Sequence, residues 1–596
     1  MRIAALFPLD FVDRFFDGRV WGCILSYRTL STTMHLSKPS RMRNLLLRPV
    51  SLAIAFCLVA GSSLPVAVGQ NAPIVGVQTE SLRSQMMEGK RLEQERRWQE
   101  AILHYEKLLK KEPKIAEYSD RLQICRVHFD VTRRYSDRSF MQVVEASSAS
   151  DAFQVLTEVL TKLEVYYVEP VDYYKLALHG TAFLEVALTE QDFCSRHLSN
   201  ADAASVEEFR RTIHKSVFGR KIQTMDELKS AIASVATQAS QRIGLSSTAV
   251  IYEYIAGSVG LLDPYSSLLT PGEYREVMSQ IDGNLIGLGV ELWAEGSELR
   301  IVDVFKGGPA QLAGISPSQY ILQVDGASVQ EIGAKKAADL LRGPEGSTVR
   351  LVLRTIDDQM LNLEVQRKRV DVPSVTVMEM AEPNVGYIRI TNFQKTTAAE
   401  VARAMMALSR EDMRSVIIDL RRNPGGLLDS AVELADQFLS RGSIVSTKGR
   451  NGQESHNFSA TAPAWDIPLV VLIDGDSASA SEIFAGAIND HNRGTIVGQT
   501  SYGKGSVQGV FHNEHGNGGL RLTVSKFFSP KGTPISARGV QPHVVVDLQE
   551  PTPSPDQVVS LKASIDTKRL VSSKLDQVDV AKLKAIEIAR QKVAFR

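Results

Sequence analysis

A serine-rich turn and a lysine between two glycines are the features of this 596-residue chain whose residue types could do chemistry. The turn, residues 474–482, joins an apolar run suited to a buried strand to an apolar helix. A hydroxyl at such a junction lies beside free helix N–H groups, which favour a developing oxyanion. Serine becomes a nucleophile when a base removes its proton, and a buried lysine can supply that base because desolvation keeps its amine neutral. Lys504, flanked by Gly503 and Gly505, suits such an inward position.

Each of these features has an ordinary alternative, since a serine before a helix is commonly an N-cap and a lysine is commonly solvated. Together, however, residues 477–482 (Ser-Ala-Ser-Ala-Ser-Glu) and residues 502–508 (Tyr-Gly-Lys-Gly-Ser-Val-Gln) resemble the motifs of the C-terminal processing, or tail-specific, peptidases. That family of serine peptidases uses a Ser–Lys dyad. The resemblance implies that Ser479 is the nucleophile and that Lys504 is the general base.

The same resemblance assigns roles to residues around the dyad. Gln508, four residues after Lys504, would hold and orient the lysine amine. Asp490 lies where several family members carry an acidic residue that matters for activity. Ser477 and Ser481 are the neighbours most easily confused with the nucleophile.

A second motif, residues 419–428 (Asp-Leu-Arg-Arg-Asn-Pro-Gly-Gly-Leu-Leu), follows an apolar run and also resembles the family. Glycines after a strand let backbone N–H groups approach a substrate carbonyl, although without a nucleophile nearby the segment would be a plain turn. We expect the oxyanion hole to consist of the amide of Gly425 or Gly426 together with that of Ala480.

Residues 283–370 change to short alternating strands separated by turn glycines, and they resemble a PDZ domain. The resemblance implies that Gly287, Leu288, Gly289 and Val290 form the loop whose N–H groups receive the terminal carboxylate of a bound peptide. The adjoining strand edge would pair with that peptide by β-augmentation. Proteins or peptides with free C-terminal tails are therefore the expected substrates and partners.

The expected fold class is a multidomain α+β protein. It comprises an N-terminal helical region, a PDZ β-barrel-like module and an α/β peptidase core of the crotonase or Clp-protease type, in which strands alternate with helices. The expected boundaries are residues 1–69 for the N-terminal extension and signal peptide, 78–135 for a helical tetratricopeptide-like region, 151–280 for a helical N-terminal part of the peptidase with an insertion and no strand, 283–370 for the PDZ domain, 371–548 for the Ser/Lys peptidase core, and 549–596 for a Pro-rich linker and helical tail.

Within the first helical region, Trp98, Ala101, Tyr105 and Leu108 fall on one stripe of a helix. The stripe resembles a single tetratricopeptide repeat, and a generic helical hairpin explains it equally well. A lone repeat cannot bury its face by itself, so it must pack on neighbouring helices. An adaptor protein bound by this repeat stays open as a partner, as does a homo-oligomer.

Residues 41–60 combine a basic start with a short apolar run, and a small-residue exit follows at Ala67-Val68-Gly69. This is the pattern of a secretory signal peptide, so we expect a protein secreted across the inner membrane into the periplasm. An uncleaved signal would instead keep it membrane-associated. Because the pattern starts well inside the chain, we expect translation to begin at Met34 or Met42.

The composition excludes other classes of partner. Basic and acidic residues are equal in number, 68 of each, so no global field favours nucleic acid. Cys125 and Cys194, the two cysteines beyond the signal region, lack the spacing of a zinc site, and we expect neither a metal nor another cofactor. The two cysteines would form one disulfide in an oxidising compartment or both remain buried thiols.

Three alternatives compete with a serine peptidase. Residues 498–504 fit the first seven positions of a phosphate-binding P-loop, but Gly505 stands where a Ser or Thr should hold magnesium, and a strand rather than a helix is predicted next. A Ser-His-Asp hydrolase would need a Gly-x-Ser-x-Gly elbow, which is absent around Ser479. The third alternative is a non-catalytic secreted scaffold of PDZ and tetratricopeptide modules, in which a buried lysine would have no use.

Overall fold

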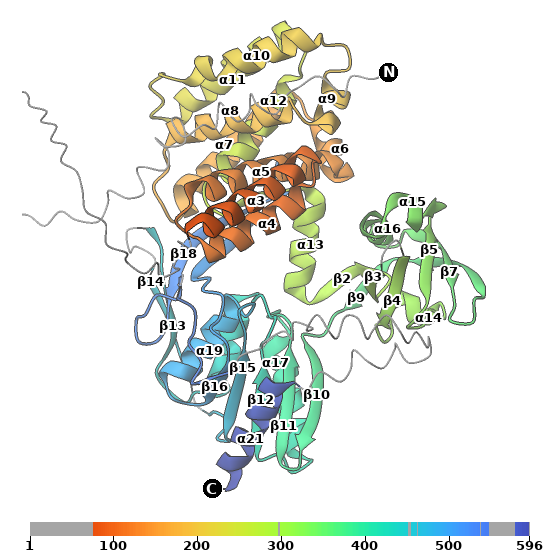
Figure 1. Cartoon of the computed structure of the whole chain (residues 1–596), viewed down its shortest axis with the longest axis vertical. Helices are drawn as coiled ribbons and strands as arrows, with labels where there is room; N and C mark the ends of the chain where they lie inside the picture. Colours follow the sequence, from red (N-terminus) through yellow and green to blue (C-terminus); the bar gives the residue numbers. More distant parts are fainter. Residues whose placement is uncertain are drawn as a thin grey trace, which may run out of the picture. The chain divides into compact units, whose positions relative to one another are not determined.

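The computed structural model describes residues 75–295, 298–450, 455–461, 463–536, 538–546 and 579–594 (Figure 1). The predicted signal peptide and the Pro-rich linker lie outside the described residues. Contacts divide the chain into two units: residues 75–136 together with Phe183–Ala201 form the first, and the other described residues form the second. Across the described ranges, no helix combines the length and the apolar character needed to cross a bilayer.

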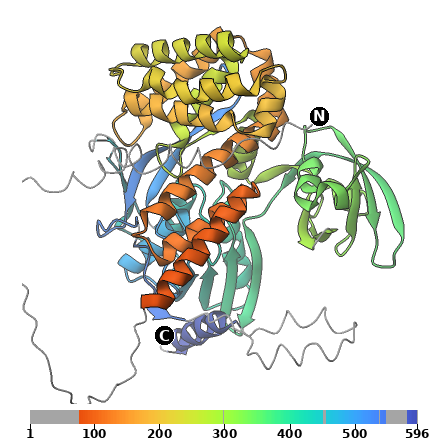
Figure 2. The same ribbon diagram turned by 45° about the horizontal axis from the view of Figure 1, so that its top comes forward.

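The first unit is made of helices. They are α3 (Val75–Gln94), α4 (Trp98–Lys111), α5 (Ala116–Ser136) and α9 (Gln191–His197), and the long ones lie side by side (Figure 2). The stripe of Trp98, Ala101, Tyr105 and Leu108 is buried, which confirms the expectation from helical periodicity. Gly89 lets α3 approach α4 closely, since a β-carbon there would come within 2.3 Å of the Tyr105 hydroxyl oxygen.

Neither cysteine of the first unit, Cys125 or Cys194, is part of a disulfide in this structure. Cys125 is buried, and its burial raises the pKa of the thiol above the ordinary value, an effect to which the negative charge of Glu93 adds. Of the two states that the sequence leaves open, the structure shows no disulfide, and of the two thiols Cys125 is buried while Cys194 is half-buried.

The helical part of the second unit precedes the β-rich segments. It contains α6 (Arg138–Ala146), α7 (Ala149–Tyr166), the first part of α8 (Tyr173–Ala187), α10 (Ala203–Val217), α11 (Met225–Ile243), α12 (Ser247–Gly260) and α13 (Pro271–Asp282). Capping boxes start α7, α11 and α13, each with Ser or Thr at the N-cap and Asp or Glu three residues later. Helix α12 is apolar on nearly all sides, and it is buried against α7 and α11.

One strand lies between α12 and α13, within residues 151–280. Strand β1 (Ser267–Leu269) pairs antiparallel with the start of β18 (Gly519–Phe528). The expectation that this part of the chain holds no strand is therefore wrong. Three residues are too few to reveal a period, and their hydrogen-bond partner lies far along the chain, where a local pattern cannot detect it.

Residues 284–371 form a small β-rich module. Its elements are β2 (Asn284–Gly287), β3 (Val290–Glu295), β4 (Glu298–Val304), α14 (Pro309–Leu312), β5 (Tyr320–Val324), β6 (Ala327–Ser328), α15 (Val329–Ile332), α16 (Ala334–Leu341), β7 (Thr348–Arg354), β8 (Met360–Gln366) and β9 (Lys368–Asp371). The sheet order is β3-β4-β5-β7-β8, with β6 paired to β5, while β2 pairs with β9. Among the described strands β3 pairs only with β4, so it lies at an edge of the sheet.

The core of the second unit is a six-stranded sheet. Its strands, in spatial order, are β10 (Val375–Glu382), β11 (Val385–Ile390), β12 (Ser415–Asp419), β15 (Leu469–Ile473), β16 (Thr495–Gly498) and β19 (Val544–Val545), parallel throughout except for β10. Every residue of β12 and β15 is buried, as their apolar runs predict. Helices α17 (Thr397–Ser409), α18 (Leu428–Asp436) and α19 (Ala480–Asp490) cover one face, and α21 (Val580–Ala594) covers the other (Figure 1).

A second sheet, in the order β1-β18-β13-β14, includes β13 (Ser443–Lys448) and β14 (Ser455–Ser459), and β17 (Ser506–His512) pairs with β18. The parallel strands β12, β15 and β16 all end at one edge of the six-stranded sheet. The segments that follow them, residues 420–427, 474–479 and 499–505, therefore start at the edge where α/β folds bind their ligands. These segments carry Ser479, Lys504, Gly425 and Gly426, whereas Ala480 and Asp490 lie on α19 and Gln508 lies on β17.

Candidate active site

Ser479 occupies a sharp turn between β15 and α19. It is the N-cap of the helix, with φ 54° and ψ −112°. A non-glycine residue at positive φ is strained and persists only where its surroundings hold it. Here the Ser479 N–H donates to Glu482 Oε2 at 2.8 Å, and the Ser479 carbonyl accepts the N–H groups of Glu482 and Ile483. The turn is thus fixed by the first turn of its own helix.

The two neighbouring serines have structural roles. Both are fully buried. The Ser477 hydroxyl donates to the Leu420 carbonyl at 2.8 Å, and the Ser481 hydroxyl donates to the Asn423 carbonyl at 3.0 Å. Both bonds attach the serine turn to the segment after β12. Ser479 is the partly exposed serine of the three.

The loop of Gly425 and Gly426 contacts the serine turn. Gly425 has φ +105°, and a β-carbon there would lie 2.8 Å from Ser479 Cβ and 2.9 Å from the Ala480 nitrogen, so the position requires glycine. The Gly425 N–H already donates to Asn423 Oδ1 at 2.9 Å. In the part of the chain that the structure describes, no hydrogen bond takes the N–H of Gly426 or Ala480. These two amides are therefore available to a substrate oxygen.

Lys504 lies on the segment between β16 and β17. Its Nζ is 4.9 Å from the centroid of the Tyr265 ring. Burial lowers the pKa of Lys504 below the ordinary value of 10.5; the positive charge of Arg521 adds to this effect, and the negative charges of Glu482 and Asp263 oppose it. The amine therefore loses its proton more readily than a solvated lysine, as a general base near neutral pH requires.

A single buried carboxylate, that of Glu482, connects the turn that carries Ser479 with the segment that carries Lys504. Glu482 Oε2 accepts the backbone N–H of Ser479 at 2.8 Å and that of Lys504 at 2.9 Å, and Oε1 accepts the Ser501 hydroxyl and the Gly503 N–H, each at 2.6 Å. Burial raises the pKa of Glu482, and these hydrogen bonds oppose the rise. The backbones of the predicted nucleophile and of the predicted base are thus held at one oxygen atom.

The predicted carboxylate-binding loop, residues 287–290, joins β2 to β3. The Leu288 carbonyl accepts the N–H of Ala310 at 2.8 Å, and the Gly289 carbonyl accepts that of Phe305 at 2.9 Å. Gly289 has φ +74°, a conformation that glycine adopts without strain. These bonds fix the loop at the start of β3, the edge strand of its sheet.

Two segments of the chain match known families. Residues 384–546 match the sequence model of Peptidase family S41, and residues 300–355 match that of a PDZ domain. The chain is 35% identical over 309 residues to the carboxy-terminal-processing protease of Bartonella bacilliformis, which covers 51% of this chain and 70% of that protein. The chain belongs to peptidase family S41.

Other S41 relatives carry similar names. The carboxyl-terminal-processing protease of Picosynechococcus is 35% identical over 306 residues, covering 50% of this chain and 73% of that protein. Among solved structures, the photosystem II D1 C-terminal processing protease is 25% identical and covers 67% of this chain and 93% of that chain, with a TM-score of 0.35. The S41 chain is a serine peptidase with a PDZ domain, and its substrates are proteins. The expected family and the expected fold class are confirmed.

Among the described residues of this S41 peptidase, no hydrogen bond or ion pair joins the predicted site residues Gln508 and Asp490 to the lysine amine. The Gln508 amide nitrogen donates to Ser506 Oγ at 2.9 Å and to Thr523 Oγ1 at 3.4 Å. Asp490 lies at the far end of α19, about 16 Å along the helix axis from Ser479 for an eleven-residue helix. Its Oδ2 accepts the Lys531 N–H at 3.0 Å. The rise of the helix therefore separates Asp490 from Ser479.

Sequence reasoning on this S41 peptidase misses Glu482 and the surroundings of the lysine. Glu482 stands three residues after Ser479, the spacing of a capping box, which could have identified it as the partner of the Ser479 N–H. Asp263 and Tyr265 lie in a turn just before β1, where Asp263 Oδ1 accepts the Tyr265 N–H at 2.8 Å and the Thr523 hydroxyl at 3.0 Å. No local signal connects this turn with Lys504, because pairing of β1 with β18 brings it there.

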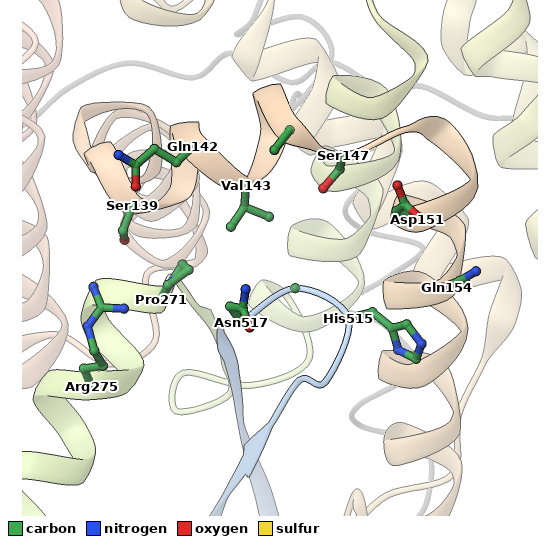
Figure 3. Close-up of a pocket in the computed structure, with 12 residues that line it drawn as sticks. Ser139, Gln142, Val143, Ser147, Asp151, Gln154, Pro271, Arg275, His515 and Asn517 are labelled. Carbon is green, nitrogen blue, oxygen red and sulfur yellow. The ribbon is translucent and has the colours of Figure 1, made fainter.

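A cavity of about 410 Å³ lies elsewhere in the S41 peptidase, where the loop between β17 and β18 meets α6, α7 and α13 (Figure 3). Asp151 and His515 are among its lining residues. Asp151 caps α7 by accepting the Ser148 N–H, and His515 Nδ1 lies 3.2 Å from Glu158 Oε2. None of the predicted catalytic residues lines this cavity.

Proposed function

We propose that this chain is a serine endopeptidase that cleaves proteins near their C-terminal tails, with Ser479 as nucleophile and Lys504 as general base. The observation that carries the proposal is the shared Glu482 oxygen, which holds the backbones of Ser479 and Lys504 together. The lowered pKa of Lys504 supports it, because a neutral amine can accept the serine proton.

In the proposed reaction the neutral Lys504 amine takes the proton of the Ser479 hydroxyl as its oxygen attacks the scissile carbonyl carbon. The amides of Gly426 and Ala480 donate to the oxyanion of the tetrahedral intermediate. The C–N bond breaks as the leaving amine takes up the proton, and water then hydrolyses the acyl-enzyme. Gln508 lies on β17, directly after the lysine loop (residues 499–505). It is proposed to orient the amine once substrate is bound.

The PDZ domain is proposed to select the substrate. A free C-terminal carboxylate would bind at Gly287, Leu288, Gly289 and Val290, and the tail would add a strand to the edge of β3. The position of β3 at the edge of its sheet supports this mode, since an edge strand presents unpaired backbone groups. The names of the relatives, which describe carboxyl-terminal processing, are consistent with tails as substrates.

The signal-like segment before residue 70 supports a periplasmic location, with an uncleaved signal as the alternative that would keep the protein on the membrane. The helical first unit is proposed as the binding site for an adaptor. The support for this is the resemblance of the segment to a tetratricopeptide repeat; the four stripe residues are buried and hold the unit together, so an adaptor would bind other residues of the unit. Homo-oligomerisation remains a separate proposal that sedimentation would test.

Covalent labelling tests the nucleophile. A serine-directed phosphonate probe should label the wild-type protein and should not label Ser479→Ala. Ser506→Ala, at a partly exposed serine near the site, is the matched control and should still be labelled at Ser479. Equal labelling of wild type and Ser479→Ala, with peptide cleavage retained in the variant, would exclude Ser479 as the nucleophile.

A further inference from the structure

The C-terminal helix α21 covers the outer face of the six-stranded sheet. Its buried residues Ala581, Ala585 and Ala589 recur every four positions, so they share one face of the helix. They pack in one apolar cluster with sheet residues that include Tyr387 and Ile417. Small side chains let the helix approach the sheet closely. Because α21 shares a buried apolar cluster with the sheet, it is part of the core of this unit.

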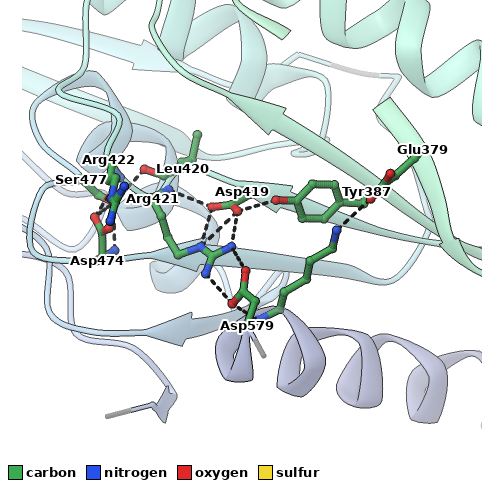
Figure 4. A network of polar contacts seen from close by, with 10 residues as sticks. Glu379, Tyr387, Asp419, Leu420, Arg421, Arg422, Asp474, Ser477 and Asp579 are labelled. Carbon is green, nitrogen blue, oxygen red and sulfur yellow. Dashed lines mark hydrogen bonds and ion pairs between the residues drawn. The ribbon is translucent and has the colours of Figure 1, made fainter. Parts of the chain in front are cut away.

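A polar network begins at the N-terminus of this helix (Figure 4). Arg421 Nη1 and Nη2 donate to the two carboxylate oxygens of Asp579, each at 2.8 Å. The same guanidinium donates to Asp419, with Nη2 2.6 Å from Oδ2, and the Tyr387 hydroxyl also donates to this oxygen at 2.6 Å. The Lys582 amine lies 4.0 Å from the centroid of the Tyr387 ring.

The network runs from the buried core to the surface. The Asp419 side chain is fully buried, that of Arg421 is 11% exposed and that of Asp579 is 39% exposed. Burial acts to raise the pKa of Asp579, but the hydrogen bonds from Arg421 and from the Lys582 N–H, together with the positive charges of these two residues, hold that pKa below the ordinary value. Removing the Asp579 charge would leave the mostly buried Arg421 guanidinium with one carboxylate partner in place of two.

The network leads directly to the candidate oxyanion donors. Arg421 is followed after one residue by Asn423, whose Nδ2 donates to the Ile390 carbonyl at 3.0 Å and whose Oδ1 accepts the Gly425 N–H at 2.9 Å. The Asn423 carbonyl also accepts the Ala478 N–H at 3.0 Å, next to Ser479. The segment of residues 420–426 is therefore held in two ways: Arg421 bonds it to Asp579 before α21, and Asn423 bonds it to the Ile390 carbonyl of the sheet.

We propose that Asp579 is a positioning residue: acting through Arg421, it holds the segment of residues 420–426 so that the backbone amides beside Ser479 meet the developing oxyanion. This inference rests on the proposed function of those amides. It makes α21 part of the catalytic unit, although residues 547–578 separate the helix from the core in the sequence. The catalytic core would then be incomplete in a chain that ends before residue 579.

Steady-state kinetics of the full-length protein test this role. Asp579→Asn keeps the shape of the side chain but removes its charge and one acceptor, and kcat should fall about tenfold with KM nearly unchanged, because oxyanion donors act in the transition state. A peptide boronic acid, which mimics the tetrahedral intermediate, should bind more weakly by a similar factor. Asp579→Glu should restore part of the loss. Glu587→Gln, on the same helix and paired with Lys584, is the matched control and should have wild-type kinetics.

The outcomes separate this inference from the proposed function. If Asp579→Asn equals Glu587→Gln in kcat, or loses activity only in proportion to the unfolded fraction seen by circular dichroism, the positioning role is wrong. If Ser479→Ala remains active, the proposed function itself fails. Loss of activity in Ser479→Ala together with wild-type kcat in Asp579→Asn would overturn only the role of Asp579.

Discussion

At the scale of single residues, the site depends on how the carboxylate of Glu482 is used. It is buried, and it accepts four hydrogen bonds: from the backbones of Ser479, Gly503 and Lys504 and from the Ser501 hydroxyl. A carboxylate in this position fixes the strained φ of Ser479 and the lysine loop at once. Its contribution to catalysis is therefore geometric, since none of these bonds involves a reacting atom.

Glu482→Gln should reduce kcat by roughly tenfold to a hundredfold, because hydrogen bonds to a charged group are each worth about 1.5–3 kcal/mol and the amide replaces one acceptor oxygen with a donor. Peptide cleavage assays measure kcat, and thermal unfolding shows whether the variant is folded. Glu411→Gln, at an exposed position, serves as the control. Wild-type kcat in Glu482→Gln would show that the shared carboxylate does not position the dyad.

The lowered pKa of Lys504 fixes the direction of the pH dependence. Below that pKa the amine is protonated and cannot accept the serine proton, so kcat/KM should be low in acid and rise through the lowered pKa toward alkaline pH. Lys504→Arg should be inactive at every pH, because a guanidinium does not act as a base. A pH–rate profile of both proteins checks this, and measurable activity of the arginine variant would contradict it.

The lowered pKa of Lys504 also makes the free energy of unfolding depend on pH, in a direction that can be stated. Between the lowered pKa and the ordinary value of 10.5, the unfolded chain binds more protons at this residue than the folded chain does. The free energy of unfolding of the wild type should therefore rise with pH in this window relative to Lys504→Met. Urea unfolding of both proteins at several pH values measures the difference.

At the scale of elements, parallel strands bring the site together. Strands β12, β15 and β16 are neighbours in the sheet, and their carboxyl ends deliver the glycine loop, the serine turn and the lysine loop to one edge. Strand β1 adds the turn of Asp263 and Tyr265 through its pairing with β18. In the PDZ domain, the element expected to position the substrate is β3, which lies at an edge of its sheet.

A substrate peptide with a free C-terminal carboxylate should be cleaved with a lower KM than the same peptide with a C-terminal amide. The expected difference is roughly tenfold or more, because charge-assisted hydrogen bonds to the loop of residues 287–290 would be lost. The kcat values should be similar, since the PDZ loop does not contact the reacting atoms. Equal KM values for the two peptides would show that this loop does not read the carboxylate.

At the scale of the whole molecule, the chain combines a helical unit with a unit that contains both the PDZ domain and the peptidase core. The proposed periplasmic location and tail trimming together predict that cells producing Ser479→Ala in place of wild type accumulate periplasmic proteins with longer C-termini. Mass spectrometry of protein C-termini in the two strains measures this. Identical sets of C-termini would contradict tail processing, and recovery of the protein from the cytoplasm would contradict secretion.

The sequence by itself determined the family, the multidomain fold class and the buried strands β12 and β15, because these depend on local motifs and on apolar runs within a few residues. The same local signals single out Ser479 and Lys504 as candidates, and Ser477 and Ser481 as their rivals. Only the tertiary structure showed that Ser477 and Ser481 are fully buried and bonded to the segment after β12. It also showed that Gly425 has its N–H occupied, that Glu482 and Tyr265 lie beside Lys504, and that Asp579 accepts a hydrogen bond from Arg421. These facts arise from contacts between residues far apart in the chain, and only the folded chain brings such residues together.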